Sequence, residues 1–389
     1  MLRFWTAGES HGESLVAWLS GVPAGLKIDQ AFLDRELWRR QQGYGRGGRQ
    51  KIERDRAHII SGVRQGKTIG SPIAILLENK DWKNWEEALP VGAGDPAKHK
   101  AVKSPRPGHA DLAGALKFNF PEARYVLERA SARESAARVA VGAVAKLFLQ
   151  ALGADILSHV LSVGSAATSE TDVPWDKLRE LCARPEILLN CADPTSEQRM
   201  KAEVDQALKN GDSVGGVFEV VAHGLAPGLG SYANWDERLD TQLAAAVMSL
   251  QAVKGVEIGS GIAAASLPGS AVQDGIAYDK PGRKFLRRSN RAGGIEGGVS
   301  NGEDIIVRGY LKPISTLRRP LESVDFGTRE PVKAAYERSD VCVVPAAGVA
   351  GEAMVALTLA RAAREKFGGD SMEEVLRNFN GYREQIQNF

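Results

Sequence analysis

The chain has 389 residues and carries 50 Lys and Arg against 48 Asp and Glu, so its formal net charge is +2. Such a balanced charge argues against a protein that coats nucleic acid or an anionic membrane, and a hydrophobic content of 43% excludes a disordered chain. The three cysteines have no metal-ligand spacing, and an odd number builds no closed disulfide framework. No run reaches the roughly 20 apolar residues of a membrane span, and the first residues lack an apolar signal core. We therefore expect a cytoplasmic protein without a metal, nucleic-acid or membrane partner.

Helical and strand patterns alternate only loosely along the chain. Apolar spacing predicts helices over residues 29–40, 131–152, 196–210, 236–254 and 351–367, with a last one beginning at Ser371. Alternating or β-branched runs predict strands over residues 57–64, 71–78 and 214–222. Because helices follow strand-rich segments in both halves, the pattern favours the α+β class over repeated βαβ units. No linker or low-complexity tract divides the chain, so we expect one domain over residues 1–389.

Two serines have the spacing of a helix capping box. Ser131 and Glu134 would open the helix over residues 131–152, and Ser371 with Glu374 would open the C-terminal one. The box does not explain Arg133, because the helix dipole disfavours a cation in the first turn. An anion bound at that helix N-terminus would offset the conflict.

Glycine is in excess, with 42 residues in 389, and its clusters lie beside arginine, serine and histidine. Ser10 and His11 lie between two glycines, which let a ligand approach the backbone closely. Histidine exchanges protons near neutral pH. His109 follows a loop stiffened by two prolines, which makes it a better catalytic candidate than a histidine on a helix face. The alternative for His11 is an exposed histidine in a glycine turn.

A basic, glycine-rich loop follows the first predicted helix. Arg39 and Arg40 precede it, and Arg46 and Arg49 lie within it. Planar guanidinium groups suit phosphate or carboxylate, and they repel one another unless an anion lies among them. The alternatives are a solvated basic loop or an RNA contact, which a net charge of +2 supports only weakly. Further Gly, Ser or Arg clusters follow at residues 293–298, 312–316 and 338–340, and together these loops suggest one large anionic ligand and an anionic substrate.

Residues 228–233 offer a different interpretation, because they match the G-x-G-x-x-A turn of dinucleotide-binding proteins. An NAD(P)-dependent dehydrogenase would need a strand running straight into these glycines, then a helix, then an acidic residue about 20 positions on. Here a Pro-Gly loop intervenes and residues 250–256 contain no acid. The dehydrogenase is therefore the weaker enzyme hypothesis.

Taken together, the clusters closely resemble the chorismate synthase family. The matching segments, in the family's order, are GESHG (8–12), RRQQGYGRGGR (39–49), SGVRQGKTIGSPI (61–73), PRPGHADL (105–112), RASARESAARVAVGAVAK (129–146), GLGSY (228–232), GGIEGGVSNG (293–302), VRGYLKPIST (307–316) and ERSD (337–340). The departures are few: Ala130 stands where a second serine is usual, and Trp38 takes the place of a frequent arginine.

The resemblance implies a lyase of the shikimate pathway, which converts 5-enolpyruvylshikimate 3-phosphate to chorismate and phosphate by an anti-1,4-elimination. It implies a requirement for reduced FMN without net redox change, with NADPH as a candidate reductant of the flavin. It also implies a homotetramer and a β-α-β sandwich, in which a helical layer lies between antiparallel sheets.

The resemblance further implies roles for individual residues. His11 would donate a proton to the departing phosphate, and His109 would stabilise charge on the reduced flavin. Asp340 would lie near flavin N5, the group proposed to take the C6 proton of the substrate, and Ser10 and Ser131 would assist the proton movements. FMN would rest on Arg129, Ala130, Ser131, Gln251, Ala252, Gly297, Lys312, Pro313, Ile314, Ser315, Thr316 and Arg338. The anions of the substrate, or of NADP, would meet Arg40, Arg46, Arg49 and Arg133.

Overall fold

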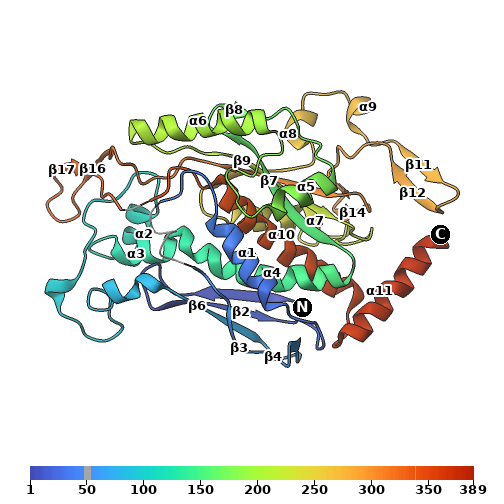
Figure 1. Ribbon diagram of the computed structural model, residues 1–389, viewed down its shortest axis with the longest axis horizontal. Helices are drawn as coiled ribbons and strands as arrows, with labels where there is room; N and C mark the ends of the chain where they lie inside the picture. The colour runs from blue at the N-terminus through green and yellow to red at the C-terminus, as the bar shows by residue number, and fades with distance from the viewer. Residues whose placement is uncertain (48–53, 338) are drawn as a thin grey trace.

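The structure, a computed structural model, describes residues 1–47, 54–337 and 339–389. Two antiparallel sheets lie on either side of a layer of helices (Figure 1). The predicted α+β class and the β-α-β sandwich implied by the resemblance are therefore confirmed. The largest cluster of buried apolar side chains runs from Leu2 to Phe379, so both ends of the chain contribute to the same core.

The N-terminal sheet has four strands in the order β1 (Arg3–Ala7), β2 (Ser14–Ser20), β6 (Ile73–Glu78) and β3 (His58–Ser61). All neighbouring strands pair antiparallel. In β2 and β6 every second side chain is fully buried, as in Leu15, Leu19, Ile73 and Leu77. This period of two places one face of the sheet on the core.

The second sheet has five strands in the order β10 (Val253–Ile258), β15 (Ile305–Leu311), β9 (Gly216–His223), β7 (Asp155–Val163) and β8 (Ala166–Ala167). Its pairs are also antiparallel. A dinucleotide fold needs parallel strands joined by crossover helices. Residues 228–233 follow β9, but Gly230 forms an isolated bridge with Val299 and no helix begins in this segment, so the dehydrogenase hypothesis is wrong in its structural premise.

The helical layer contains α1 (Gln30–Gln41), α4 (Ser135–Ala151), α7 (Leu239–Met248) and α10 (Val344–Phe367). Between the two sheets, α4 packs against β2 and β6 and α10 packs against β7 and β9. The two long helices cross at Gly142, where an added Cβ would lie 2.3 Å from the Cβ of Ala353. Glycine is therefore required at this crossing, because any side chain would push the helices apart.

Smaller elements complete the chain. The helices are α2 (Asp111–Phe118), α3 (Arg124–Ala130), α5 (Trp175–Ala183), α6 (Pro194–Asn210), α8 (Gly261–Ala264), α9 (Gly269–Val272) and α11 (Met372–Gln387). The 3₁₀ turns are η2 (Lys80–Asn84), η3 (Pro96–Lys98) and η4 (Ala132–Glu134). The hairpins are β4 (Val63–Arg64) with β5 (Lys67–Thr68), β11 (Ile276–Asp279) with β12 (Lys284–Arg287), β13 (Ile295–Glu296) with β14 (Val299–Ser300), and β16 (Glu322–Val324) with β17 (Pro331–Lys333).

One of the two predicted capping boxes is wrong. Ser371 and Glu374 form the expected box at the start of α11. Ser131 instead caps the short turn η4, and the Glu134 carboxylate accepts hydrogen bonds from Thr6 Oγ1, Arg138 and Gln251. Contacts from Thr6 and Gln251, in two distant parts of the chain, and from Arg138 one turn further along α4 therefore outweigh the local reciprocal bond at this position.

The helix α10 is long and apolar enough to cross a membrane by length and composition alone, but 89% of its apolar 18-residue segment is buried inside the fold.

Charged side chains from α1, α4 and α10 meet inside the helical layer. Arg39 of α1 donates to Glu36 and to both oxygens of Glu352 on α10, and Lys146 of α4 contacts the same two carboxylates. All four groups are buried. Arg39, which the sequence grouped with the anion-binding loop, therefore joins the helices of the core.

Candidate active site

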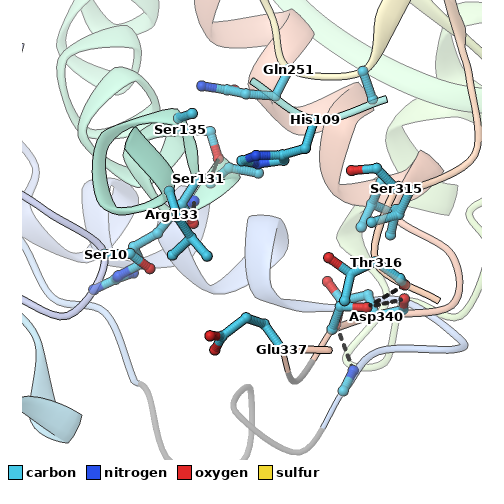
Figure 2. A pocket seen from close by; sticks show the side chains of 18 of the residues that line it. Ser10, His109, Ser131, Arg133, Ser135, Gln251, Ser315, Thr316, Glu337 and Asp340 are labelled. Atoms are coloured by element: carbon cyan, nitrogen blue, oxygen red, sulfur yellow. Dashed lines mark hydrogen bonds between the residues drawn. The ribbon is translucent and has the colours of Figure 1, made fainter. Parts of the chain in front are cut away.

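A cavity of about 770 Å³ is lined by residues from several separate parts of the chain, between residues 10 and 350. Figure 2 shows Ser10, Ser131 and Arg133 on one side of it, His109 and Gln251 across its upper edge, and Ser315, Thr316 and Asp340 on the opposite side. The predicted site residues that line the cavity are Ser10, His11, Arg40, Arg46, His109, Ala130, Ser131, Arg133, Gln251, Ala252, Lys312, Pro313, Ile314, Ser315, Thr316 and Asp340.

Arg40 and Arg133 share one buried carboxylate. Asp55 accepts from Arg40 Nη2 at 2.7 Å and from Arg133 Nη1 with both oxygens at 2.7 Å, and Arg133 Nε donates to Asn79 Oδ1 at 2.9 Å. Burial alone would raise the pKa of Asp55, but the two arginines lower it overall. Burial also lowers the pKa of Arg40, which Asp55 opposes and Arg133 reinforces. Two buried cations therefore depend on a single anion.

Arg46 and Asp340 form a second charged pair on the facing wall. Arg46 Nη1 lies 3.0 Å from Asp340 Oδ2, while Asp340 Oδ1 accepts the backbone N–H of Gly47 at 2.5 Å. The Val341 N–H donates to the Gly45 carbonyl, which ties the arginine loop to the segment before α10. Within the described parts of the chain, the Nε atoms of Arg40 and Arg46 are buried without a hydrogen-bond partner. Unpartnered buried donors of this kind fit an anionic ligand.

His11 lies in the turn between β1 and β2 and is held by Glu128 of α3. The His11 Nδ1 lies 2.9 Å from Glu128 Oε1, and the His11 N–H donates to Glu128 Oε2 at 2.7 Å. The Ser10 N–H donates to the Glu128 carbonyl at 2.9 Å. The imidazole also stacks on Trp85, with ring centroids 4.0 Å apart. One residue of α3 therefore fixes both the backbone and the ring of the predicted proton donor.

His109 has a comparable support immediately before α2. Its Nδ1 lies 2.5 Å from Asp111 Oδ1, and Arg106 donates to both oxygens of Asp111. Arg106 Nη1 donates to Thr316 Oγ1 at 2.8 Å, which links this loop to the segment after β15. Burial alone would raise the pKa of Asp111, but the hydrogen bonds from His109 and Arg106 hold it well below its usual range. Asp111 is therefore an ionised carboxylate that only accepts hydrogen bonds.

The remaining walls combine an apolar surface with backbone and hydroxyl groups. The apolar part comes from Leu250, Val343, Ala346, Ala347 and Ala350. The Lys312 N–H donates to the carbonyl of Ala252, which adopts a left-handed φ of 69°, and Lys312 Nζ donates to the Gly108 carbonyl. Burial, with a smaller effect from Lys254, lowers the pKa of Lys312. The cavity therefore has a charged end at the arginines and a largely apolar end beside α10.

The sequence and the fold are both similar to those of known proteins. The chorismate synthase family model matches residues 2–363. A chorismate synthase from Koribacter versatilis (strain Ellin345) is 72% identical over the full length of both chains, and one from Geobacter sulfurreducens is 53% identical over the full length of both. The chain belongs to the chorismate synthase family. A crystal structure of a chorismate synthase superposes with a TM-score of 0.80 at 41% identity and covers 100% of this chain and 99% of its own.

Chorismate synthases are lyases that eliminate phosphate from 5-enolpyruvylshikimate 3-phosphate in the last common step of the shikimate pathway, and the family needs a reduced flavin. The family assignment agrees with a cavity that has a charged end at the arginines and a largely apolar end beside α10. Among the described residues no group of three His, Cys, Asp or Glu could hold a metal ion, and the three cysteines are buried and unpaired.

Two described residues implied by the family resemblance, Arg129 and Gly297, do not line the cavity. Arg129 donates to the carbonyls of Thr6 and Gly8 and keeps a half-exposed side chain, and Gly297 lies in the turn between β13 and β14. Arg49 and Arg338 lie outside the described residues. The flavin contacts of Arg129, Gly297 and Arg338 stay predictions, as does the contact of Arg49 with the substrate or NADP.

Sequence reasoning missed the groups that hold the catalytic candidates. These are Asp55, Trp85, Arg106, Asp111 and Glu128. Arg106 and Asp111 flank His109 in the segment PRPGHADL, so their proximity to it was a signal that could have found them. Glu128 lies 117 positions from His11 and had no local signal.

Proposed function

We propose that the cavity binds 5-enolpyruvylshikimate 3-phosphate together with reduced FMN and catalyses the family's elimination of phosphate. The observation that carries the proposal is the excess of positive charge at one end. Among the described residues, the guanidinium groups of Arg40, Arg46 and Arg133 meet only two carboxylates, Asp55 and Asp340. The substrate carries a phosphate and two carboxylates, and anions of this kind would complete the cluster.

The apolar end of the cavity fits a flavin. Small side chains of α10 line this end, and the lining also includes hydroxyl and amide groups, as in many cofactor sites. The residues that would hold FMN are Arg129, Ala130, Ser131, Gln251, Ala252, Gly297, Lys312, Pro313, Ile314, Ser315, Thr316 and Arg338. When bound, reduced FMN supplies electron density to the elimination without net redox change.

The chain's own residues would position the anions and move protons. His11, held by Glu128, would donate a proton to the departing phosphate as a general acid. His109, held by Asp111, would stabilise negative charge that the bound ligands carry or develop. The hydroxyls of Ser10 and Ser131 would pass protons near these groups. The carboxylate of Asp340 lines the cavity, and it would also take part in proton transfer.

Calorimetry of substrate binding in the presence of FMN tests the charged end. We expect Arg46→Gln to weaken binding of the substrate tenfold or more, because it removes a charge-assisted hydrogen bond worth about 1.5–3 kcal/mol. The matched control is Arg184→Gln, which removes an exposed arginine outside the cavity. Equal affinities in wild type and Arg46→Gln would contradict the assignment.

We further propose that the protein works in the cytoplasm as a homotetramer. Exposed apolar side chains gather on and before the β11–β12 hairpin, at Ile262, Leu267, Ile276, Tyr278 and Phe285. Such patches are typical of surfaces that bind another chain. Light scattering after gel filtration should give a particle of four 41.8 kDa chains, and a monomer would contradict the proposal.

A further inference from the structure

His11 and His109, the two histidines of the cavity, make the same kind of contacts with their neighbours. In each case the imidazole Nδ1 contacts a buried carboxylate, and an arginine donates a hydrogen bond to the same carboxylate. The chains are His11–Glu128–Arg124 and His109–Asp111–Arg106.

At His11 the proton on Nδ1 follows from its partner. Glu128 is buried and accepts from Arg124 Nη1 at 3.3 Å as well as from the His11 backbone. Burial would raise the pKa of Glu128, but His11 and Arg124 lower it overall, so the group stays ionised. An ionised carboxylate has no proton to donate, so the hydrogen between Glu128 and His11 must belong to Nδ1.

At His109 two contacts compete for the same nitrogen. Arg106 Nη2 lies 3.0 Å from His109 Nδ1, and Asp111 Oδ1 lies 2.5 Å from it. A guanidinium only donates, so its bond would need a bare Nδ1, whereas the carboxylate needs a hydrogen there. The shorter contact to the carboxylate decides the case, and Arg106 Nη2 donates instead to Asp111 Oδ1 at 3.0 Å.

We propose that Glu128 and Asp111 are positioning residues, which hold His11 and His109 in the Nδ1–H tautomer and stabilise each ring when it carries a second proton. The proton that either histidine exchanges with a ligand is then the one on Nε2. The catalytic consequence rests on the proposed function, whereas the tautomer is a property of the protein alone. The same logic orients histidine in other enzymes that use a carboxylate behind the ring.

Other charged groups also lie near His11. Lys100 lies 4.1 Å from the Trp85 ring centroid, and Arg124 lies 5.0 Å from it, on the indole that stacks against His11. These cations oppose a positive imidazole. Asp81 accepts a hydrogen bond from Trp85 Nε1 at 3.2 Å, and Glu128 contacts the imidazole itself. At His109 the nearby cations are Arg106 and Lys312, and Asp111 contacts the imidazole as Glu128 does at His11.

The tautomers can be read directly by ¹⁵N-resolved imidazole spectra of the full chain, since it has only six histidines. His11→Gln and His109→Gln variants assign the two signals. In wild type at mildly alkaline pH we expect both rings as the Nδ1–H tautomer. Glu128→Gln should turn His11 into a mixture without changing His109, and Asp111→Asn should do the reverse, so each variant is the control for the other.

Glu122→Gln provides a further control, because Glu122 contacts His99 at 3.2 Å outside the cavity. With substrate and reduced FMN, Glu128→Gln should lower kcat/KM about tenfold, while Glu122→Gln leaves it near the wild-type value. An Nε2–H tautomer at either ring in wild type would overturn the proposal for that ring, even if no variant folds. Correct tautomers in a protein without activity would refute the proposed function and leave the positioning intact.

Discussion

Removal of the Asp55 charge perturbs the charged end of the cavity most directly. Asp55→Asn keeps the shape of the side chain but takes away the anion to which Arg40 and Arg133 donate at 2.7 Å. Both arginines are at least 92% buried, so water replaces only part of the lost contact. Removing one member of a buried ion pair costs about 3–5 kcal/mol, and we expect the free energy of unfolding to fall by that amount.

An anion should restore part of this loss. Inorganic phosphate at about 100 times its Kd adds about 2.7 kcal/mol to the stability of a protein that binds it. Because Asp55→Asn leaves the arginines without their own counterion, phosphate should stabilise the variant more than wild type. Urea unfolding with and without phosphate measures both effects.

The matched control is Glu87→Gln, which breaks an ion pair with Lys98 of similar length, 2.8 Å, between side chains that are 70% and 48% exposed. Such a surface pair contributes about 0–1 kcal/mol, so this variant should remain close to wild type with or without phosphate. A loss below about 1 kcal/mol for Asp55→Asn, or equal stabilisation of variant and wild type by phosphate, would refute the reasoning.

Three further predictions concern turnover, acid stability and ligand coupling. His11→Ala and His109→Ala should each lower turnover about 10²-fold or more in an assay with chemically reduced FMN, and full activity in both would contradict their roles. Burial would raise the pKa of Glu36, but Arg39 and Lys146 hold it at about 2. The ionised Glu36 therefore stabilises the fold fully above its unfolded pKa near 4.5, and this stabilisation is lost as the pH falls toward 2. At neutral pH we expect Glu36→Gln to be less stable than wild type by roughly 3 kcal/mol. Urea titrations should show this difference shrinking between pH 4.5 and 2. FMN and substrate should each tighten the binding of the other, because both order the same loops, and independent affinities in calorimetry would disprove this coupling.

The sequence predicted elements well where the signal was local. The helix over residues 196–210 is α6 (Pro194–Asn210), and the capping box at Ser371 is present. The helix predicted over residues 236–254 ends earlier, because α7 stops at Met248 and Val253 already begins β10. An apolar run of this kind suits either structure, and pairing with β15 decides the outcome.

Neighbouring residues can also have different surroundings that the sequence does not reveal. Arg39 and Arg40 are adjacent, but successive positions on a helix point about 100° apart. Arg39 therefore reaches Glu352 in the core, while Arg40 reaches Asp55 beside the cavity. The choice depends on carboxylates that are 313 and 15 positions away in the chain.

The candidate site was predicted mainly through the family resemblance, which named residues from many distant segments. Local chemistry alone suggested anionic ligands but gave no partner for Arg133. Its carboxylate, Asp55, lies 78 positions away, so only the tertiary fold brings the two together. Residues that support a site through long-range contacts therefore escape sequence reasoning unless they adjoin a motif.

The measurement that tests the central claim most directly is release of phosphate and chorismate from 5-enolpyruvylshikimate 3-phosphate under anaerobic conditions. FMN is reduced with dithionite in one sample and supplied with NADPH in another. We predict equal amounts of both products with dithionite-reduced FMN and none without flavin. Product with NADPH as well would add an intrinsic flavin reductase activity. No product from folded protein that binds reduced FMN would contradict the proposed function.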